Sequence, residues 1–138
     1  MAVFNSKVNL RSESFNRNRR EMLELIQKLA ELNARGAEIS EKRKPRFDAR
    51  GQLLPRERLA RLLDPGMPFL HIGNLSGYLL DTKNPEKSIP GSTVIAGIGF
   101  ICGARCMIVI DDSGIMAGSM TAAGGYKIRR AEEISLEQ

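Results

Sequence analysis

The 138-residue sequence contains no tryptophan, a single histidine and only two cysteines, and these scarcities exclude several kinds of site. A closed structural zinc site normally needs four cysteine or histidine ligands, which His71, Cys102 and Cys106 cannot supply. A Ser-His-Asp or Cys-His catalytic arrangement is also unsupported, because the only histidine has no evident partner in the sequence. The cysteines stand in an apolar stretch, so we expect buried free thiols rather than a disulfide or a metal site.

Long apolar runs are also absent. No run of about 18 apolar residues occurs, so we expect no transmembrane helix. The first twenty residues are polar and arginine-rich and lack the apolar core of a secretory signal. Glu13 and Glu21 interrupt what would otherwise resemble an organellar transit peptide, and we therefore expect a cytoplasmic protein. With 42% apolar and 27% charged residues, the composition is typical of one globular domain rather than a disordered chain.

The net charge of +5 is distributed unevenly. Residues 1–62 carry 15 Lys+Arg and 8 Asp+Glu, giving +7, whereas residues 63–138 carry 6 and 8, giving −2. The basic residues alternate with glutamates and are accompanied by few aromatic side chains, which is a poor platform for stacking nucleic-acid bases. This pattern favours a solvated helix surface or a protein interface over nucleic-acid binding.

An amphipathic helix is predicted over residues 14–35. Its apolar residues recur at the spacing of one helical face and include Met22, Leu25, Ile26 and Leu29. Ser12 or Ser14 is suited to cap its start, and Gly36 is suited to end it. The apolar face needs a partner, from this chain or another. Residues 40–50 are predicted to be a charged linker.

The second region, residues 51–138, begins with a short helix that has Pro55 in its first turn and ends at residues 64–66. A short strand is predicted over residues 69–72 and a polar loop over residues 81–91. Residues 93–101 and 105–110 are predicted to form a hairpin, with a turn around residues 102–104.

Two features of this hairpin carry further expectations. Gly97 and Gly99 lie inside the first strand, where glycine usually marks a bulge or a close backbone approach. Residues 108–110 are consecutively apolar, as expected for a strand covered on both faces. The adjacent Asp111 and Asp112 point to opposite faces of a strand, so we expect them to end the strand and cap the next turn rather than act as a catalytic pair.

A small-residue segment, residues 117–125, follows the hairpin and precedes a helix predicted to begin near Gly125 or Tyr126. Backbone amides between a strand and a helix can face an anion, so this segment either holds phosphates or a thioester, or merely allows close packing. It contains neither a P-loop nor a dinucleotide-binding motif. Lys127, Arg129 and Arg130 either contact such phosphates or form a solvated surface. The helix lacks a stop signal at Gln138, which is typical of a truncated chain.

Two stretches resemble a known family. The segment Gly51 to Gly66 contains Arg-Glu-Arg followed by Leu-Leu-Asp, and the aromatic residue Phe69 follows it. It is similar to the corresponding segment of acyl-CoA carboxylase beta subunits. The second stretch combines Gly97-Ile98-Gly99, the hairpin, the Gly118-Ser119 loop and the helix start at Lys127 to Ala131, in the order of the same family. The methylcrotonyl-, geranyl- and propionyl-CoA carboxylases form the branch it resembles.

This resemblance implies an α/β, crotonase-like fold of stacked ββα units over residues 51–138, preceded by an N-terminal helix and linker over residues 1–50. It implies a carboxyltransferase that moves a carboxyl group from carboxybiotin to an acyl-CoA, with biotin carried on a partner alpha subunit that has biotin carboxylase and biotin carrier functions. It also implies a homo-oligomer of beta subunits. From the scarcity of cysteine and histidine, we expect no metal in this chain. The residues that the resemblance assigns to CoA binding are Gly118, Ser119 and Lys127, and it assigns no catalytic residue within this chain.

Two other functions remain open. The chain is a non-catalytic interaction module if its basic N-terminal helix docks a partner independently of the rest. Alternatively, the complete protein is a biotin-linked decarboxylase of CoA esters, which runs the same carboxyl transfer in reverse. The sequence leaves the acyl group of the substrate unassigned.

Overall fold

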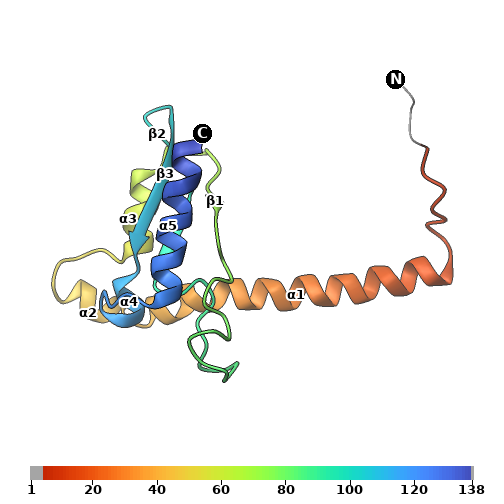
Figure 1. Ribbon diagram of the computed structural model, residues 1–138, viewed down its shortest axis with the longest axis horizontal. Helices are drawn as coiled ribbons and strands as arrows, with labels where there is room; N and C mark the ends of the chain where they lie inside the picture. Colours follow the sequence, from red (N-terminus) through yellow and green to blue (C-terminus); the bar gives the residue numbers. More distant parts are fainter. Residues whose placement is uncertain (1–4, 138) are drawn as a thin grey trace. The chain divides into compact units, whose positions relative to one another are not determined.

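The computed structural model describes residues 5–137 (Figure 1). The chain divides into two compact units at a boundary between Glu31 and Leu32, inside the first helix, and each unit is described by itself. The predicted domain boundary after residue 50 stays a prediction. The elements are α1 (Glu13–Glu41), α2 (Lys44–Asp48), α3 (Pro55–Leu62), β1 (Leu70–His71), β2 (Val94–Ile101), β3 (Ala104–Asp111), α4 (Ser113–Met116) and α5 (Ala122–Glu137).

Helix α1 begins as predicted and ends later than predicted. The hydroxyl oxygen of Ser12 accepts a hydrogen bond from the amide of Phe15 at 3.2 Å, which confirms the cap at this end. The prediction that Gly36 ends the helix is wrong, because Gly36 is buried inside it. A Cβ at this position would lie 3.2 Å from the carbonyl oxygen of Pro90, so glycine allows the helix to approach that loop closely.

The predicted linker over residues 40–50 is also partly helical. Residues 40 and 41 still belong to α1, and α2 forms a further short helix with a proline in its first turn. Proline is favoured at that place because the missing amide hydrogen would have had no partner within the helix.

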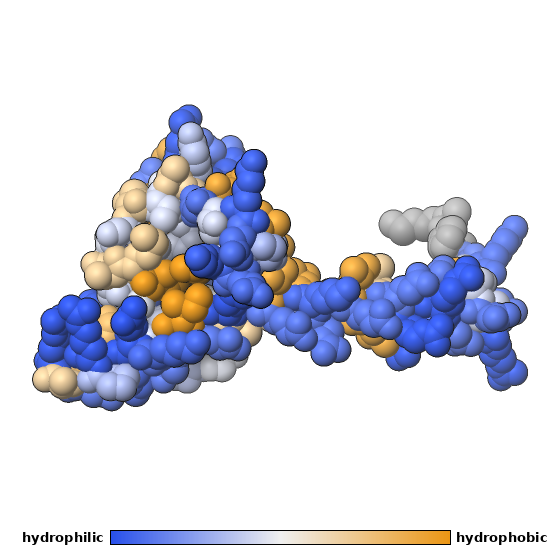
Figure 2. All heavy atoms as spheres, turned by 90° about the horizontal axis from the view of Figure 1, so that it is seen from below, coloured by the Kyte–Doolittle hydropathy of each residue, from blue (hydrophilic) through white to orange (hydrophobic). Residues whose placement is uncertain are grey.

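The apolar face of α1 in the first unit is exposed. Met22, Leu25 and Ile26 expose 56%, 58% and 53% of their surface. Figure 2 shows orange apolar patches that interrupt the blue hydrophilic surface of this helix. The amphipathic pattern is therefore correct, and the expectation that this face needs a partner stays a prediction.

The second unit is built on an antiparallel sheet with the strand order β1-β2-β3. The predicted hairpin is confirmed, with Ile101 paired to Ala104 across a two-residue turn. Cys102 and Gly103 both have positive φ angles, 52° and 79°, as the favoured tight hairpin turn requires. The carboxylate of Asp64, just after α3, accepts hydrogen bonds from both turn amides at 2.7 Å, which ties the turn to the end of that helix.

Side chains from α3 and the hairpin form the core. Leu59, Ile95 and Ile108 are buried together, and Leu63 and Phe69 pack against them. Gly97 allows this packing, because a Cβ there would lie 2.5 Å from both the Leu70 carbonyl oxygen and the Phe69 ring. The expected close backbone approach in this strand is thus confirmed, and Figure 1 shows α5 running alongside β2 and β3.

The prediction that residues 108–110 form a strand covered on both faces is wrong for the described chain. Strand β3 lies at the edge of the three-stranded sheet, and Val109 exposes 39% of its surface. The strand with buried residues on both faces is the central one, β2, where Val94, Ile95 and Ala96 are all buried. Consecutive apolar residues favour a strand that is covered on both faces. They do not show which elements would provide that cover.

Helix α5 begins at Ala122, three or four residues before the predicted start. The hydroxyl of Thr121 accepts a hydrogen bond from the amide of Gly124 at 3.0 Å and so supplies a helix cap that was not predicted. The cysteines are free thiols as expected, but Cys102 is exposed at the hairpin turn and Cys106 is half-buried, so the prediction of buried thiols is wrong for Cys102. Within residues 5–137, no helix is long and apolar enough to span a membrane.

Candidate functional site

Asp112 is the buried anchor of a polar network at the end of β3. It exposes 1% of its surface, whereas the adjacent Asp111 is exposed, as their alternation along a strand predicts. Asp112 Oδ1 accepts hydrogen bonds from the Ser40 hydroxyl at 2.6 Å and from the Gly114 amide at 3.2 Å. These contacts join the end of α1 to the start of α4 and confirm that Asp112 caps the turn after the strand.

The other carboxylate oxygen of Asp112 faces Arg56. Arg56 Nε lies 3.3 Å from Asp112 Oδ2, close enough for an ion pair. The two atoms are buried, and neither forms a well-aligned hydrogen bond with another described residue. The two atoms therefore compensate each other by charge rather than by a well-aligned hydrogen bond.

Lys127 projects from α5 into the same region. It is buried, and Lys127 Nζ donates hydrogen bonds to the carbonyl oxygens of Val94 at 2.6 Å and Gly91 at 3.2 Å. Burial, and next the positive charge of Arg56, lower the pKa of Lys127 to about 8. The side chain therefore links the start of α5 to the segment that leads into β2, and its proton is held less tightly than that of a solvated lysine.

Arg56, Asp112 and Lys127 line a common cavity of about 150 Å³, together with His71 and uncharged residues of the Pro90–Ile95 segment. The ring of His71 packs edge-on against Phe69, with ring centroids 4.6 Å apart. Burial lowers the pKa of His71, and the charges of Arg56 and Lys127 lower it further. The cavity thus combines two cations with one carboxylate, and its histidine is disposed to be neutral at pH 7.

The turn that follows α4 carries the other two predicted site residues. Ala117 and Gly118 both have positive φ angles, 53° and 88°, and Gly118 and Ser119 are exposed. The amide of Ser119 donates to the carbonyl of Met116 at 3.0 Å, so it serves the turn itself. Gly118 and Ser119 therefore stand on an accessible turn, whereas Lys127 stands inside the cavity, and the three residues have different surroundings.

Arg56 and Ser40 were not predicted to be members of a polar network. For Arg56 a signal was present, because it opens the Arg-Glu-Arg motif, but the motif alone does not show that Asp112 is its partner. Ser40 gave no signal, since it lay in a segment predicted to be a linker.

Solved structures have the same fold as this chain. The beta subunit of P. aeruginosa geranyl-CoA carboxylase matches 99% of this chain with a TM-score of 0.88 and 39% sequence identity, over 25% of its own chain. A transcarboxylase 12S structure matches 86% of this chain with a TM-score of 0.63 and 25% identity. The fold is therefore that of the crotonase-like carboxyltransferases, as predicted.

The sequence gives the same assignment at the level of the family. Residues 46–138 match the carboxyl transferase domain, and the chain belongs to that family. A probable methylcrotonoyl-CoA carboxylase beta chain from Drosophila melanogaster is 33% identical over 136 residues, which cover 98% of this chain and 23% of that protein. A 3-methylcrotonyl-coenzyme A carboxylase beta1 subunit from Mycobacterium tuberculosis is 39% identical over 86% of this chain and 21% of that protein. The chain thus spans about a quarter of the length of its relatives or less.

Proposed function

We propose that the protein from which this chain comes is the carboxyltransferase component of a biotin-dependent acyl-CoA carboxylase. It transfers the carboxyl group of carboxybiotin to an acyl-CoA, and this chain forms part of the half that binds the acyl-CoA. The observation that carries the proposal is the match of 99% of the chain to the geranyl-CoA carboxylase beta subunit at a TM-score of 0.88. Biotin is carried by a partner alpha subunit, and beta subunits assemble with one another.

Within this chain we assign CoA contacts to Gly118, Ser119 and Lys127. The exposure of Gly118 and Ser119 supports direct contact, because a ligand can approach the main chain closely at this turn. Lys127 is proposed to act from the cavity, where its ammonium group already donates to two carbonyl oxygens. The oxyanion-stabilising groups that the reaction needs are not assigned to residues of this chain.

The location of the protein in the cell is a separate proposal. A cytoplasmic location remains our prediction from the character of the N-terminal residues. The Drosophila melanogaster relative bears the word mitochondrial in its name, so the two locations are distinguished by imaging the tagged protein in its own cells.

The test is a transfer assay on the complete protein with its biotinylated partner subunit. We expect carboxylation of at least one of methylcrotonyl-, geranyl-, propionyl- or acetyl-CoA, measured as ATP-dependent fixation of labelled bicarbonate into an acid-stable product. Omission of the partner subunit is the control and abolishes fixation. The proposal is contradicted if the partner subunit is shown to be carboxylated and none of the four thioesters accepts the carboxyl group.

A second candidate is a decarboxylase that removes the carboxyl group from a CoA ester. A methylmalonyl-CoA decarboxylase subunit alpha from Veillonella parvula is 29% identical over 85% of this chain. Release of CO2 from methylmalonyl-CoA without ATP, faster than the ATP-dependent forward reaction, favours this candidate. Binding of a partner protein by residues 1–50 alone, without any transfer, favours the interaction module instead.

A further inference from the structure

The turn formed by Gly118 and Ser119, here called the Gly118–Ser119 turn, has few contacts of its own. Among residues 5–137, apart from its chain neighbours, no atom lies within 4 Å of the place that a Cβ on Gly118 would take. The Ser119 amide donates to the Met116 carbonyl at 3.0 Å, which is a bond within the turn. The position of this turn therefore depends on the two helices that it joins, α4 and α5.

Helix α4 is too short to hold that position by itself. It contains four residues, and a single helical turn is unstable without contacts to the rest of the protein. Asp112 supplies such contacts, because its Oδ1 atom accepts hydrogen bonds from the Gly114 amide and from the Ser40 hydroxyl. A Cβ on Gly114 would overlap with the Ser40 hydroxyl oxygen, so α4 lies directly against the end of α1.

Arg56 supplies the charge that keeps Asp112 in this place. Arg56 Nε lies 3.3 Å from Asp112 Oδ2, and the Asp112 side chain is 0% exposed. Among residues 5–137, no other cation lies within ion-pair distance of Asp112. A buried carboxylate that loses its counter-charge is strongly unfavourable. Removal of Arg56 is therefore expected to displace Asp112, and α4 with it.

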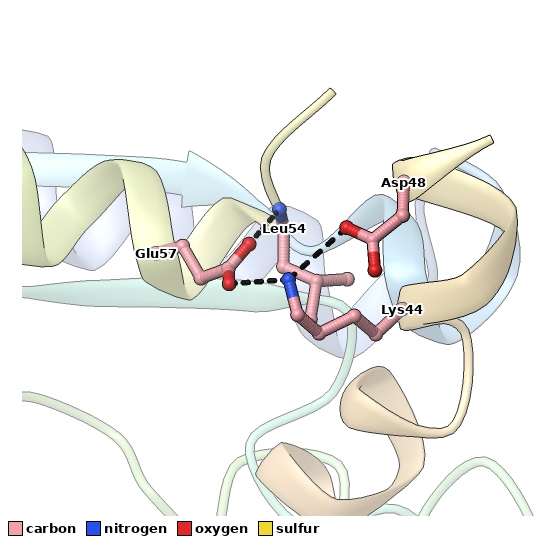
Figure 3. A network of polar contacts seen from close by, with 4 residues as sticks. All are labelled: Lys44, Asp48, Leu54 and Glu57. Atoms are coloured by element: carbon pink, nitrogen blue, oxygen red, sulfur yellow. Dashed lines mark hydrogen bonds and ion pairs between the residues drawn. The ribbon is translucent and has the colours of Figure 1, made fainter. Parts of the chain in front are cut away.

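Arg56 itself comes from a fixed element, the first turn of α3. The next residue, Glu57, accepts a hydrogen bond from the Leu54 amide at 2.8 Å through one carboxylate oxygen. Its other oxygen lies 2.6 Å from Lys44 Nζ, which also lies 3.2 Å from Asp48 Oδ1 (Figure 3). This network ties the start of α3 to α2, and it thereby fixes the backbone from which Arg56 reaches Asp112.

The other end of the turn is held independently of Asp112. The hydroxyl of Thr121, just before α5, is hydrogen-bonded to the hydroxyl of Ser92. Lys127, further along α5, donates to two carbonyl oxygens at and before the start of β2. Loss of Arg56 is therefore expected to move the α4 end of the turn while the contacts of α5 remain.

We propose that Arg56 and Ser40 are positioning residues for acyl-CoA binding. They hold Asp112, Asp112 holds α4, and α4 sets the conformation of the Gly118–Ser119 turn. This inference rests on the proposed function, which makes the turn a contact of the acyl-CoA. It assigns control of substrate affinity to side chains that do not themselves contact the substrate.

The test compares Arg56→Gln with Arg58→Gln in the complete protein, assembled with its biotinylated partner subunit. Arg58 lies on the same helix, is exposed and carries the same charge, so it is the matched control. Fixation of labelled bicarbonate gives kcat and the KM for the thioester that the unchanged protein carboxylates, and titration calorimetry gives the Kd of CoA. Thermal unfolding establishes the folded fraction of each variant.

We expect Arg56→Gln to raise the KM and the Kd at least about tenfold and to leave kcat within about twofold. A displaced turn weakens binding without removing a reacting group, so the effect falls on affinity. The control is expected to stay within about twofold of the unchanged protein in all three constants.

Two further variants test the connection through Asp112. Arg56→Lys keeps a positive charge beside the carboxylate and is expected to raise the KM less than about threefold, because a single contact joins Arg56 to Asp112. Ser40→Ala keeps the ion pair and removes one hydrogen bond, so we expect the KM to rise about threefold. If Arg56→Gln does not fold, Ser40→Ala decides, and an unchanged KM in that variant overturns the inference.

The remaining outcomes separate this inference from the proposed function. A lower kcat in proportion to the unfolded fraction, with KM unchanged, indicates a structural role only and overturns the inference. An equal rise of KM in Arg56→Gln and Arg58→Gln indicates a general charge effect and also overturns it. In both cases the unchanged protein still transfers the carboxyl group, so the proposed function stands. If the unchanged protein carboxylates no thioester, the proposed function fails and this inference fails with it.

Discussion

Asp111 and Asp112 have the same side chain and adjacent places in the sequence, yet they have opposite surroundings. Asp111 is exposed, whereas Asp112 is enclosed by a serine hydroxyl, a main-chain amide and a guanidinium group. The alternation of a strand produces this difference, since neighbouring residues face opposite sides of the sheet. The two positions therefore provide a matched pair for measuring what burial of the carboxylate contributes.

We predict that Asp112→Asn lowers the free energy of unfolding by about 2 kcal/mol, whereas Asp111→Asn changes it by less than about 0.5 kcal/mol. Breaking a fully buried ion pair costs about 3–5 kcal/mol, but the Arg56 side chain is 34% exposed, and water partly compensates it. Chemical denaturation of both variants measures the difference. Equal effects at the two positions would contradict a special role for the buried network.

The lowered pKa of Lys127 predicts a pH dependence of stability. The folded-state pKa of about 8 lies below the 10.5 of an ordinary lysine, so the unfolded chain binds more protons between these two pH values. The free energy of unfolding therefore gains a contribution from Lys127 as pH rises from about 8 to 10.5. Below about pH 8 that contribution is absent, because the protonated amine is buried.

Lys127→Met removes the titrating group and keeps an apolar side chain in its place. We expect the stability of the unchanged protein, relative to this variant, to rise across the window from about pH 8 to 10.5. Denaturation curves at several pH values measure that difference, in which contributions of other titrating groups cancel. A difference that stays constant with pH would show that Lys127 titrates normally.

The packing of strand β2 depends on two positions that carry no side chain, Gly97 and Gly99. The strand lies between β1 and β3, and Gly97 and Gly99 leave room for Leu63, just after α3, and Phe69, just before β1. A Cβ on Gly99 would overlap with a methyl group of Leu63. Because these two positions lack side chains, the end of α3 can pack on the sheet. Glycine at the same time weakens the strand.

We predict that Gly97→Ala destabilises the protein by more than about 2 kcal/mol, because the added methyl group would lie 2.5 Å from the Leu70 carbonyl oxygen. Gly125→Ala, within α5, is the control. A Cβ on Gly125 would have one neighbour within 4 Å, the Met120 sulfur at 3.8 Å. Alanine in place of a helical glycine is expected to stabilise by up to about 1 kcal/mol. Thermal unfolding of the two variants checks the opposite signs, and destabilisation by both would contradict the close-approach explanation.

The elements that the sequence predicted well are those whose signal is local. The hairpin turn needs positive φ at two successive residues, and the short helix α3 carries proline in its first turn, so both were identified from a few residues. What the sequence did not predict involves residues far apart in the chain. Gly36 was expected to end the helix, but it lies inside α1, where its missing side chain allows close approach to Pro90. Asp112 was correctly predicted to cap a turn, but its partners Ser40 and Arg56 were not.

At the scale of the whole molecule, the described chain leaves apolar surface open in each unit. In the first unit this is the face of α1 that contains Leu25 and Leu29. In the second unit it includes Val109, on the edge strand β3. Exposed apolar helix faces and unpaired strand edges commonly mark places where further protein packs. The proposed assembly with other subunits is one way in which the apolar face of α1 would be covered.

We predict that Leu25→Ser/Leu29→Ser lowers the oligomeric state of the complete protein. These side chains expose 58% and 43% of their surface, so their removal leaves no cavity in the described chain. Light scattering after size-exclusion chromatography measures the mass. Glu24→Ser/Gln27→Ser, on the opposite side of the helix, is the control, and an equal loss of mass in both variants would contradict a role for the apolar face.

The contact between Asp64 and the hairpin turn has a consequence for amide hydrogen exchange. Cys102 and Gly103 stand at an exposed tip, where amides normally exchange with solvent within seconds to minutes. Both of their amides donate to the Asp64 carboxylate at 2.7 Å, so their exchange requires the turn to leave the end of α3. Slow exchange at these two accessible positions would therefore report how often the hairpin detaches from the helix that anchors it.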